Sequence, residues 1–109
     1  MTNNNEVAQR QKMTKGGVIT QEILDALAEQ CAMKYAEVKD QVSISDNISD
    51  ETLRKIGPTT NDIAALCVIN VYQARYYLLK LMEEGLVLKT GVKKGYPLHW
   101  WLIGAEKTQ

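Results

Sequence analysis

Apolar side chains recur at intervals of three and four residues over residues 20–38. The recurring positions are Ile23, Leu24, Leu27, Cys31, Tyr35 and Val38. Because 3.6 residues complete one turn of an α-helix, this spacing gathers them on one face, which we expect to be buried. Thr20 is suited to cap the start of this helix. Residues 1–17 are rich in Asn, Gln and Lys and end in two glycines, and they predict a flexible N-terminal arm.

The apolar periodicity stops after residue 38. Ser, Asp and Asn dominate residues 43–49 and favour turns, and residues 50–56 then form a short helical stretch that Ser49 can cap. Gly57 and Pro58 end that stretch. We expect residues 39–58 to be a segment inserted into the domain.

Two further helical stretches follow with only a short connection between them. The first begins at Thr59 or Thr60, whose hydroxyl can accept a hydrogen bond from a free amide of the first turn. The second covers residues 71–84, with Asn70 as its cap and Gly85 at its end. Two helices joined by such a turn predict a helix-turn-helix unit.

Residues 86–90 and 98–103 have the composition of strands, and the glycine-containing residues 91–97 between them form a loop. This hairpin, or wing, completes an α+β fold that is mainly α-helical: a winged helix-turn-helix domain over residues 18–105, followed by a tail at 106–109. Since alternate strand residues face opposite sides, we expect either Trp100 or Trp101 to be partly exposed.

The charge of the chain limits how it could bind nucleic acid. The formal net charge is zero, which excludes a protein that coats nucleic acid through bulk positive charge. Acidic residues outnumber basic ones before residue 59, and cations are in excess after it. We therefore expect any nucleic-acid contact in the second half of the chain.

Residue types required for metal binding, catalysis or membrane insertion are scarce. Cys31 and Cys67 lie in apolar helical patterns and predict two buried free thiols, as suits a cytoplasmic protein. No apolar stretch is long enough to span a membrane, and residues 1–12 do not resemble a signal peptide. His99 is the only histidine, expected as a strand residue with a satisfied ring nitrogen, and no glycine-rich phosphate loop occurs. The sequence predicts no enzyme, no cofactor and no metal site.

The helix over residues 71–84 divides into two unlike faces. Ala74, Tyr77, Leu78 and Leu81 form its core face. The opposite face holds Tyr72, Tyr76 and Leu79, flanked by Gln73, Arg75 and Lys80. Gln can pair with adenine and Arg with guanine, and a later lysine can contact phosphate. Packing of the two tyrosines against a partner subunit or against residues 39–58 is the structural alternative.

The wing carries two lysines, Lys93 and Lys94, between Gly91 and Gly95. They can approach the phosphate backbone or a minor groove, although a solvated turn would have the same composition. The predicted DNA-binding residues are Thr60, Tyr72, Gln73, Arg75, Tyr76, Lys80, Lys93 and Lys94.

One string in this region is specific enough to indicate a family. Residues 72–79 read YQARYYLL, residues 81–85 read LMEEG, and residues 93–95 read KKG ahead of Trp100. Over about residues 60–104 the chain closely resembles the PapI/FaeA family of fimbrial phase-variation regulators. The resemblance implies a winged helix and transcriptional control of pilus or adhesin operons in enteric bacteria. It also implies cooperation with the leucine-responsive global regulator at sites controlled by adenine methylation.

The function predicted from these features is a sequence-specific regulator that binds double-stranded DNA at a fimbrial or adhesin-type operon, together with a global regulator. The alternative is a winged-helix adapter that docks on another DNA-bound regulator and has little DNA affinity of its own. Zero net charge and the aromatic face of residues 71–84 favour the adapter.

Overall fold

The computed structural model describes residues 15–41 and 48–105. The predicted tail, most of the predicted arm and residues 42–47 of the predicted insertion lie outside the described residues. The described elements, in chain order, are α2 (Lys15–Val38), α3 (Asp50–Ile56), α4 (Thr60–Cys67), α5 (Val71–Glu83), β1 (Val87–Lys89) and β2 (Trp100–Leu102).

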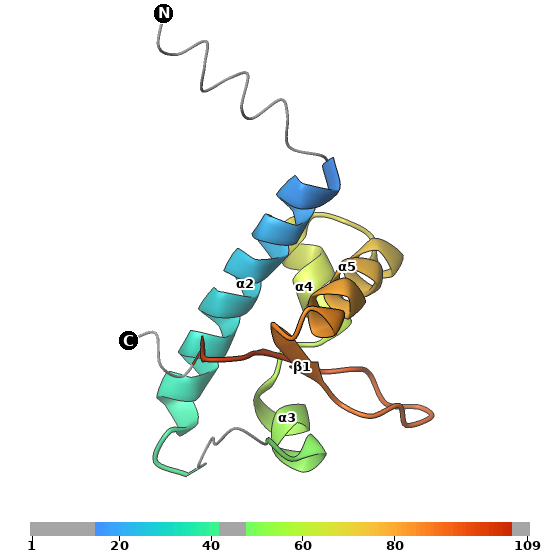
Figure 1. Ribbon diagram of the computed structural model, residues 1–109. Coiled ribbons are helices and arrows are strands. Elements are labelled where there is room, and N and C mark those ends of the chain that lie inside the picture. Colours follow the sequence, from blue (N-terminus) through green and yellow to red (C-terminus); the bar gives the residue numbers. More distant parts are fainter. Residues whose placement is uncertain (1–14, 42–47, 106–109) are drawn as a thin grey trace, which may run out of the picture.

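The long helix α2 runs along one side of the molecule, and α4, α5, β2 and α3 all pack against it (Figure 1). Strands β1 and β2 pair antiparallel, with Leu88 opposite Trp101. The loop that joins them projects away from α2 as the wing (Figure 1). The predicted fold class, mainly helical α+β with a winged helix-turn-helix arrangement, is confirmed.

The helix start predicted at Thr20 is wrong, because α2 already includes Lys15–Ile19. Ile19 is only 9% exposed and joins the core one turn before Ile23. Burying this side chain contributes roughly 1.5–3 kcal/mol, which offsets the cost of the adjacent helical glycines at about 1 kcal/mol each. The end of the predicted arm, residues 15–17, is therefore helical.

The later helix boundaries follow local capping chemistry, as predicted. Ser49 accepts a hydrogen bond from the Thr52 amide at the start of α3. At the start of α4 the Thr59 hydroxyl accepts from the Asp62 amide, and the Asp62 carboxylate accepts from the Thr59 amide. These caps satisfy amide groups that have no partner within the helix.

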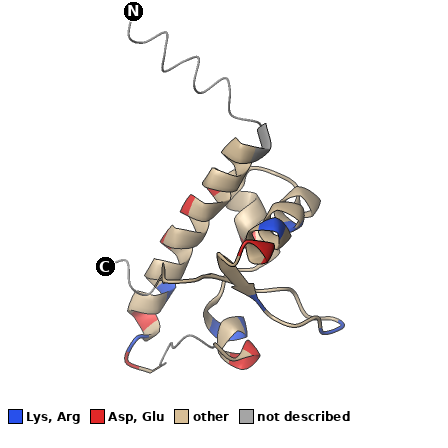
Figure 2. Cartoon of the chain, viewed as in Figure 1, with Lys and Arg blue, Asp and Glu red and all other residues tan. Residues whose placement is uncertain are grey.

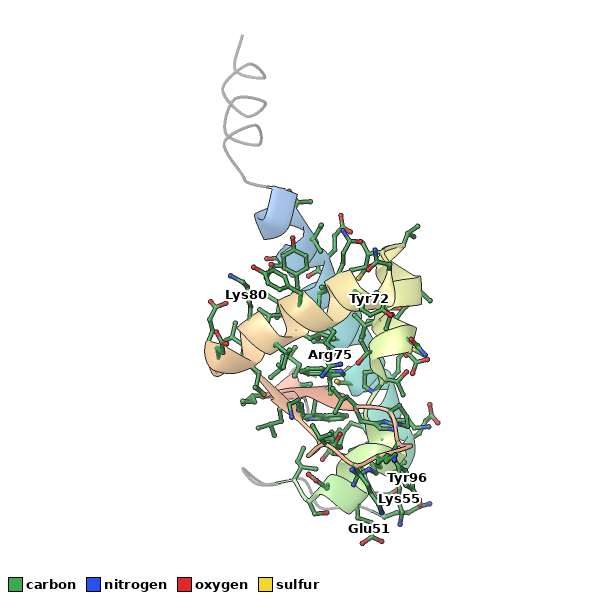
Figure 3. All side chains as sticks on the ribbon, turned by 90° about the vertical axis from the view of Figure 1, so that its right-hand side faces the viewer. Glu51, Lys55, Tyr72, Arg75, Lys80 and Tyr96 are labelled. Atoms are coloured by element: carbon green, nitrogen blue, oxygen red, sulfur yellow. The ribbon has the colours of Figure 1, made fainter. Side chains whose placement is uncertain are left out.

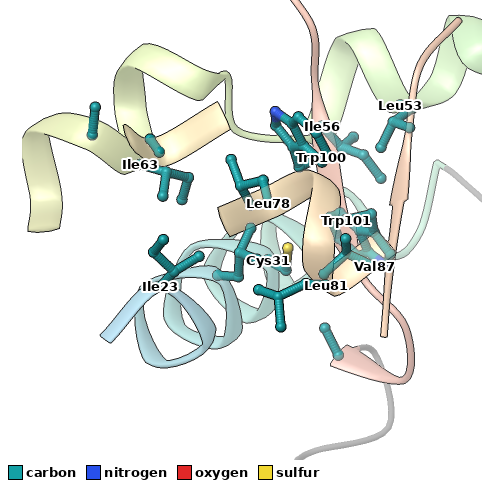
Figure 4. Close-up of a cluster of buried hydrophobic side chains, with 14 of the residues drawn as sticks. Ile23, Cys31, Leu53, Ile56, Ile63, Leu78, Leu81, Val87, Trp100 and Trp101 are labelled. Atoms are coloured by element: carbon teal, nitrogen blue, oxygen red, sulfur yellow. The ribbon is translucent and has the colours of Figure 1, made fainter. Parts of the chain in front are cut away.

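Helix α3 is part of the core rather than a surface decoration. Leu53 and Ile56 are 1% and 4% exposed and pack with the tryptophans of β2 (Figure 4). The backbone after α3 lies close to β2, because a Cβ atom on Gly57 would come within 2.6 Å of the Trp100 carbonyl oxygen. Only glycine allows this close approach.

The junction between α3 and α4 pairs with the start of β2. The Trp100 amide donates to the Pro58 carbonyl at 2.9 Å, and Thr59 and His99 form an isolated antiparallel bridge. The Thr60 amide donates to the Leu98 carbonyl at 3.3 Å. The returning side of the wing therefore has a backbone partner on both edges.

The expectation of one exposed tryptophan is wrong, because Trp100 and Trp101 are both at most 1% exposed. Helix α2 packs on β2 while α5 packs on β1, and both indole rings are buried in the core. The Trp100 indole Nε1 donates to the buried Thr60 hydroxyl at 2.9 Å. The Trp101 Nε1 is buried without a hydrogen-bond partner among the described residues.

The prediction of two free thiols is confirmed, but only Cys31 is fully buried. Cys67 is half-buried, and partial burial together with the charge of Glu22 raises the pKa of its thiol. Among the helices that the structure describes, none combines the length and apolar character that a membrane-spanning helix requires.

The turn between α4 and α5 contains Val68 in the left-handed conformation, at φ 54° and ψ 48°. Its amide donates to the Ala64 and Ala65 carbonyls and so closes α4. Asn70 and Gln73 then form a capping box that starts α5. A β-branched residue is strained in this conformation, and the Val68 side chain is 89% exposed, so little packing compensates.

The two tryptophans should respond differently to replacement by phenylalanine. Trp100→Phe loses indole volume and leaves the buried Thr60 hydroxyl without its donor, so we expect a loss of about 2–4 kcal/mol in unfolding free energy. Trp101→Phe loses similar volume but removes an unpaired N–H, so we expect about 1–2 kcal/mol. Urea unfolding monitored by circular dichroism measures both, and an equal or reversed cost would contradict the assigned Thr60 contact.

Val68→Gly should stabilise the protein, because glycine adopts the left-handed turn without steric cost. We expect a gain of about 1 kcal/mol after allowing for the greater freedom of glycine in the unfolded chain. The matched control is Val92→Gly, since Val92 is 81% exposed but does not have a positive φ. Thermal melting of both variants is the measurement, and stabilisation by the control but not by Val68→Gly would disprove the strained turn.

Candidate nucleic-acid interface

Helix α5 has the two faces that the sequence predicts. Ala74, Leu78 and Leu81 are at most 1% exposed, and Tyr77 is half-buried. On the other side Tyr72 is 82% and Tyr76 54% exposed. Leu79, expected with these tyrosines, is instead half-buried against the core, since it lies at the boundary between the faces.

Gln73, a predicted DNA-binding residue, also caps the start of α5. Gln73 is exposed, but its Oε1 accepts from the Asn70 amide at 3.3 Å, while its own amide donates to the Asn70 side chain at 2.8 Å. The side-chain carbonyl therefore holds the start of α5 and leaves the NH₂ group to donate elsewhere. Bidentate pairing with adenine uses both ends of the amide, so it would require opening the capping box.

Tyr76 contacts both Tyr77 and Lys80 on α5. Its ring meets the edge of the Tyr77 ring, with centroids 5.1 Å apart, and the Lys80 Nζ lies 5.2 Å from the Tyr76 centroid. A hydrogen bond with Tyr76 raises the pKa of Lys80, and the charges of Glu83 and Glu84 raise it further. Lys80 thus places a cation beside an exposed aromatic ring.

Thr60 does not join the other predicted site residues. It is 9% exposed, and its hydroxyl accepts from the Trp100 indole beneath the surface. The structure therefore gives this residue a role in holding α4 against β2.

The wing presents its two lysines at the tip. Lys93 and Lys94 are exposed, and the Tyr96 amide donates to the Lys93 carbonyl to form the turn. Gly95 has a φ of 85°, a conformation that suits glycine. The Lys93 Nζ lies 4.4 Å from the centroid of the Tyr96 ring, a cation–π contact.

The base of the wing is held by His99 and Thr90. The Thr90 amide donates to the His99 carbonyl, and the His99 amide donates to the Thr90 hydroxyl. The His99 Nδ1 lies 2.6 Å from the Gly57 carbonyl oxygen, so its predicted hydrogen bond is confirmed. Within the part of the chain that the structure describes, no three His, Cys, Asp or Glu side chains gather where they could hold a metal.

The outward face of α5 and the wing lie on one side of the molecule, away from α2. Figure 3 shows Tyr72 and Arg75 on α5 above the wing, with Tyr96 at the far end of the loop. Figure 2 shows basic residues on α5 and at the wing tip, and acidic residues at the end of α5 and along α2. Five of the eight predicted residues thus belong to the outward side of α5, and the exposed pair Lys93 and Lys94 belongs to the wing. Together they form a two-part surface that could contact one DNA duplex.

Two residues that the sequence reasoning missed contact the wing. The Asp50 carboxylate accepts from the Gly91 amide at 2.9 Å, and the Arg54 guanidinium donates to the Gly91 carbonyl at 3.3 Å. An acidic and a basic residue four positions apart were visible in the sequence. Their partner lies 37 and 41 residues later in the chain, which no local pattern reveals.

Comparisons with known proteins identify relatives over the same region. The family described as FaeA-like protein matches residues 12–104, so the match includes α2 and α3. The chain is 41% identical over 51 residues to the major pilus subunit operon regulatory protein of Escherichia coli, covering 47% of this chain and 66% of that protein. It is 37% identical over 54 residues to the P fimbrial regulatory protein KS71A of Escherichia coli, covering 50% of this chain and 70% of that protein. The chain thus spans about two thirds of the length of these relatives.

Proposed function

The chain belongs to the FaeA-like family, and on this premise we propose that it is a sequence-specific DNA-binding transcription regulator of a fimbrial or adhesin-type operon. The names of the two relatives, which describe regulators of a pilus subunit operon and of P fimbriae, support the biological setting. The observation that carries the proposal is the exposed face of α5, with Tyr72, Arg75 and Tyr76, on the same side as the lysine-tipped wing.

Each residue of this surface has a proposed role. Helix α5 is the second helix of the helix-turn-helix unit and would enter the major groove, where Arg75 can pair with guanine and the Gln73 amide can donate to a base. Tyr72 and Tyr76 supply apolar contact area and a hydroxyl. Lys80, Lys93 and Lys94 would neutralise phosphates. Thr60 has no direct role in this proposal, because its hydroxyl is buried and accepts from the Trp100 indole.

We further propose that the protein works beside a second DNA-bound protein. Zero net charge limits the non-specific electrostatic attraction that most DNA-binding domains use. A partner on the same duplex would compensate by holding the protein at a high local concentration. The leucine-responsive global regulator is the partner that the family resemblance suggests. This role is non-catalytic and requires a cytoplasmic location.

The adapter remains a second candidate because of a specific observation. Tyr72 in the first turn of α5 is 82% exposed, and Val68 in the turn between α4 and α5 is 89% exposed. Exposed aromatic and aliphatic groups of this kind are also common in protein interfaces. In this mode α5 would contact the partner protein.

Alanine substitutions on α5 should weaken sequence-specific DNA binding more than non-specific DNA binding. The probes are duplexes that the full chain selects from a random-sequence pool, and a scrambled duplex of equal length. We expect Arg75→Ala and Tyr76→Ala to weaken binding to the selected duplex about tenfold or more, with little effect on the scrambled one. Lys34→Ala on α2 is the charge control. If both α5 variants keep full affinity and selectivity, the outward face of α5 is not the DNA-binding surface.

Mobility shifts with and without a partner should distinguish the two functions. A direct regulator shifts the selected duplex alone, with an affinity that falls steeply as salt rises. An adapter shifts DNA only when purified leucine-responsive regulator is present, and because its α5 contacts that protein, Arg75→Ala weakens the joint complex equally on the selected and the scrambled duplex. Weakening of the joint complex by Arg75→Ala on the selected duplex alone supports cooperative DNA binding.

A further inference from the structure

Two side chains of helix α3 form hydrogen bonds with the backbone of one wing residue, Gly91. The Asp50 carboxylate accepts from the Gly91 amide at 2.9 Å, and the Arg54 guanidinium donates to the Gly91 carbonyl at 3.3 Å. The two side chains also lie 3.9 Å apart as an ion pair one helical turn from each other. Both polar groups of Gly91 are thus held by charged partners, which form stronger hydrogen bonds than neutral ones.

A second contact reaches further along the same loop. The Arg54 guanidinium lies 5.8 Å from the Tyr96 ring centroid, and the Lys93 Nζ lies 4.4 Å from that same centroid. Tyr96 is therefore in contact with a cation of α3 and with a cation of the wing tip. The approach is close, since a Cβ atom at position 91 would lie 3.1 Å from the Asp50 carboxylate oxygen.

We propose that α3 is a brace for the wing, and that Asp50 and Arg54 are positioning residues that hold Lys93 and Lys94 where they can contact the DNA bound by α5. This inference rests on the proposed function. The ladder between β1 and β2 ends at the pair Lys89 and Trp100, and only the bonds between Thr90 and His99 extend it. Beyond that point the contacts with α3 restrict the loop, and a restricted loop loses less entropy on binding.

Helix α3 supplies its own control. Glu51 and Lys55 form a second ion pair, 3.8 Å apart, at the neighbouring positions of the same two turns. Their side chains are 84% and 70% exposed, and Figure 3 shows them at the outer end of α3. Asp50 and Glu51 share the first turn, and Arg54 and Lys55 share the last, so substitutions in either pair have equal effects on helix charge.

The test compares Asp50→Ala with Glu51→Ala in the full chain, using a duplex that the wild type selects. Removing a carboxylate should by itself strengthen DNA binding, because it lowers repulsion from phosphate. The brace predicts the opposite sign for Asp50→Ala: binding about fivefold weaker, with a salt dependence reduced by up to about two phosphate contacts. Glu51→Ala should bind as well as the wild type or better.

Two further measurements isolate positioning from general damage. In a Lys93→Ala/Lys94→Ala background, Asp50→Ala should cost no further affinity, because the groups that it positions are gone. Amide ¹⁵N relaxation without DNA should show residues 91–97 becoming mobile in Asp50→Ala and staying ordered in Glu51→Ala. If Asp50→Ala fails to fold, Asp50→Asn and Arg54→Lys replace it, with Lys55→Arg as the control for the latter.

Each outcome has one meaning. A mobile wing together with weaker, non-additive DNA binding supports the brace. A wing that stays ordered in Asp50→Ala overturns it, as does a mobile wing with unchanged affinity. If the wild type selects no duplex, the proposed function fails instead, and the relaxation data alone decide whether α3 orders the wing.

Discussion

The arrangement of this protein depends on the pairing between the α3–α4 junction and the start of β2. Trp100 takes part through its backbone, which donates to Pro58, and through its indole, which donates to Thr60. Because the same short stretch ends α3, starts α4 and lines the returning side of the wing, these hydrogen bonds place the three elements relative to one another. The fully buried Trp100 and Trp101 side chains then tie this layer to α2 and the hydrophobic core.

Helix α5, which carries most of the candidate interface, packs against α2, α4 and β1. Helix α5 uses Ala74, Leu78 and Leu81 to pack and leaves Tyr72, Arg75 and Tyr76 for the outside. The exposed rings are large apolar groups that an ordinary surface helix would replace with Glu or Lys. Their exposure, in a chain whose net charge is zero, favours recognition by fitted contacts over recognition by bulk charge.

The parts of the fold set by neighbouring residues could be predicted from the sequence. Ser49, Thr59 and Asn70 cap the helices that they precede, and Gly85 follows the end of α5 with a φ of 79°. The start of α2 could not be predicted, because burial of Ile19 outweighs two helical glycines. The burial of Trp101 could not be predicted either, since strand alternation does not reveal which helices pack on the two strands.

In the candidate site, too, local features could be predicted from the sequence and contacts between distant residues could not. The outward face of α5 follows from helical phase, and the family string made it more specific. The capping chemistry of Thr60 is local, but its hydrogen bond with the Trp100 indole, 40 residues later, has no local signal in the sequence. The contacts of Asp50 and Arg54 with Gly91 are equally non-local, and only the folded chain reveals them.

The hydrogen bonds between α3 and Gly91 mean that base preference and wing position would depend on different helices. These two properties could then change independently. Under the proposals above, base preference would reside in α5, whereas the position of the wing on DNA would depend on α3. In evolutionary terms, a change in the length or tilt of α3 could alter the spacing between the two contact points while leaving every reading side chain intact. Related regulators could therefore diverge in operator geometry and in base sequence by independent routes.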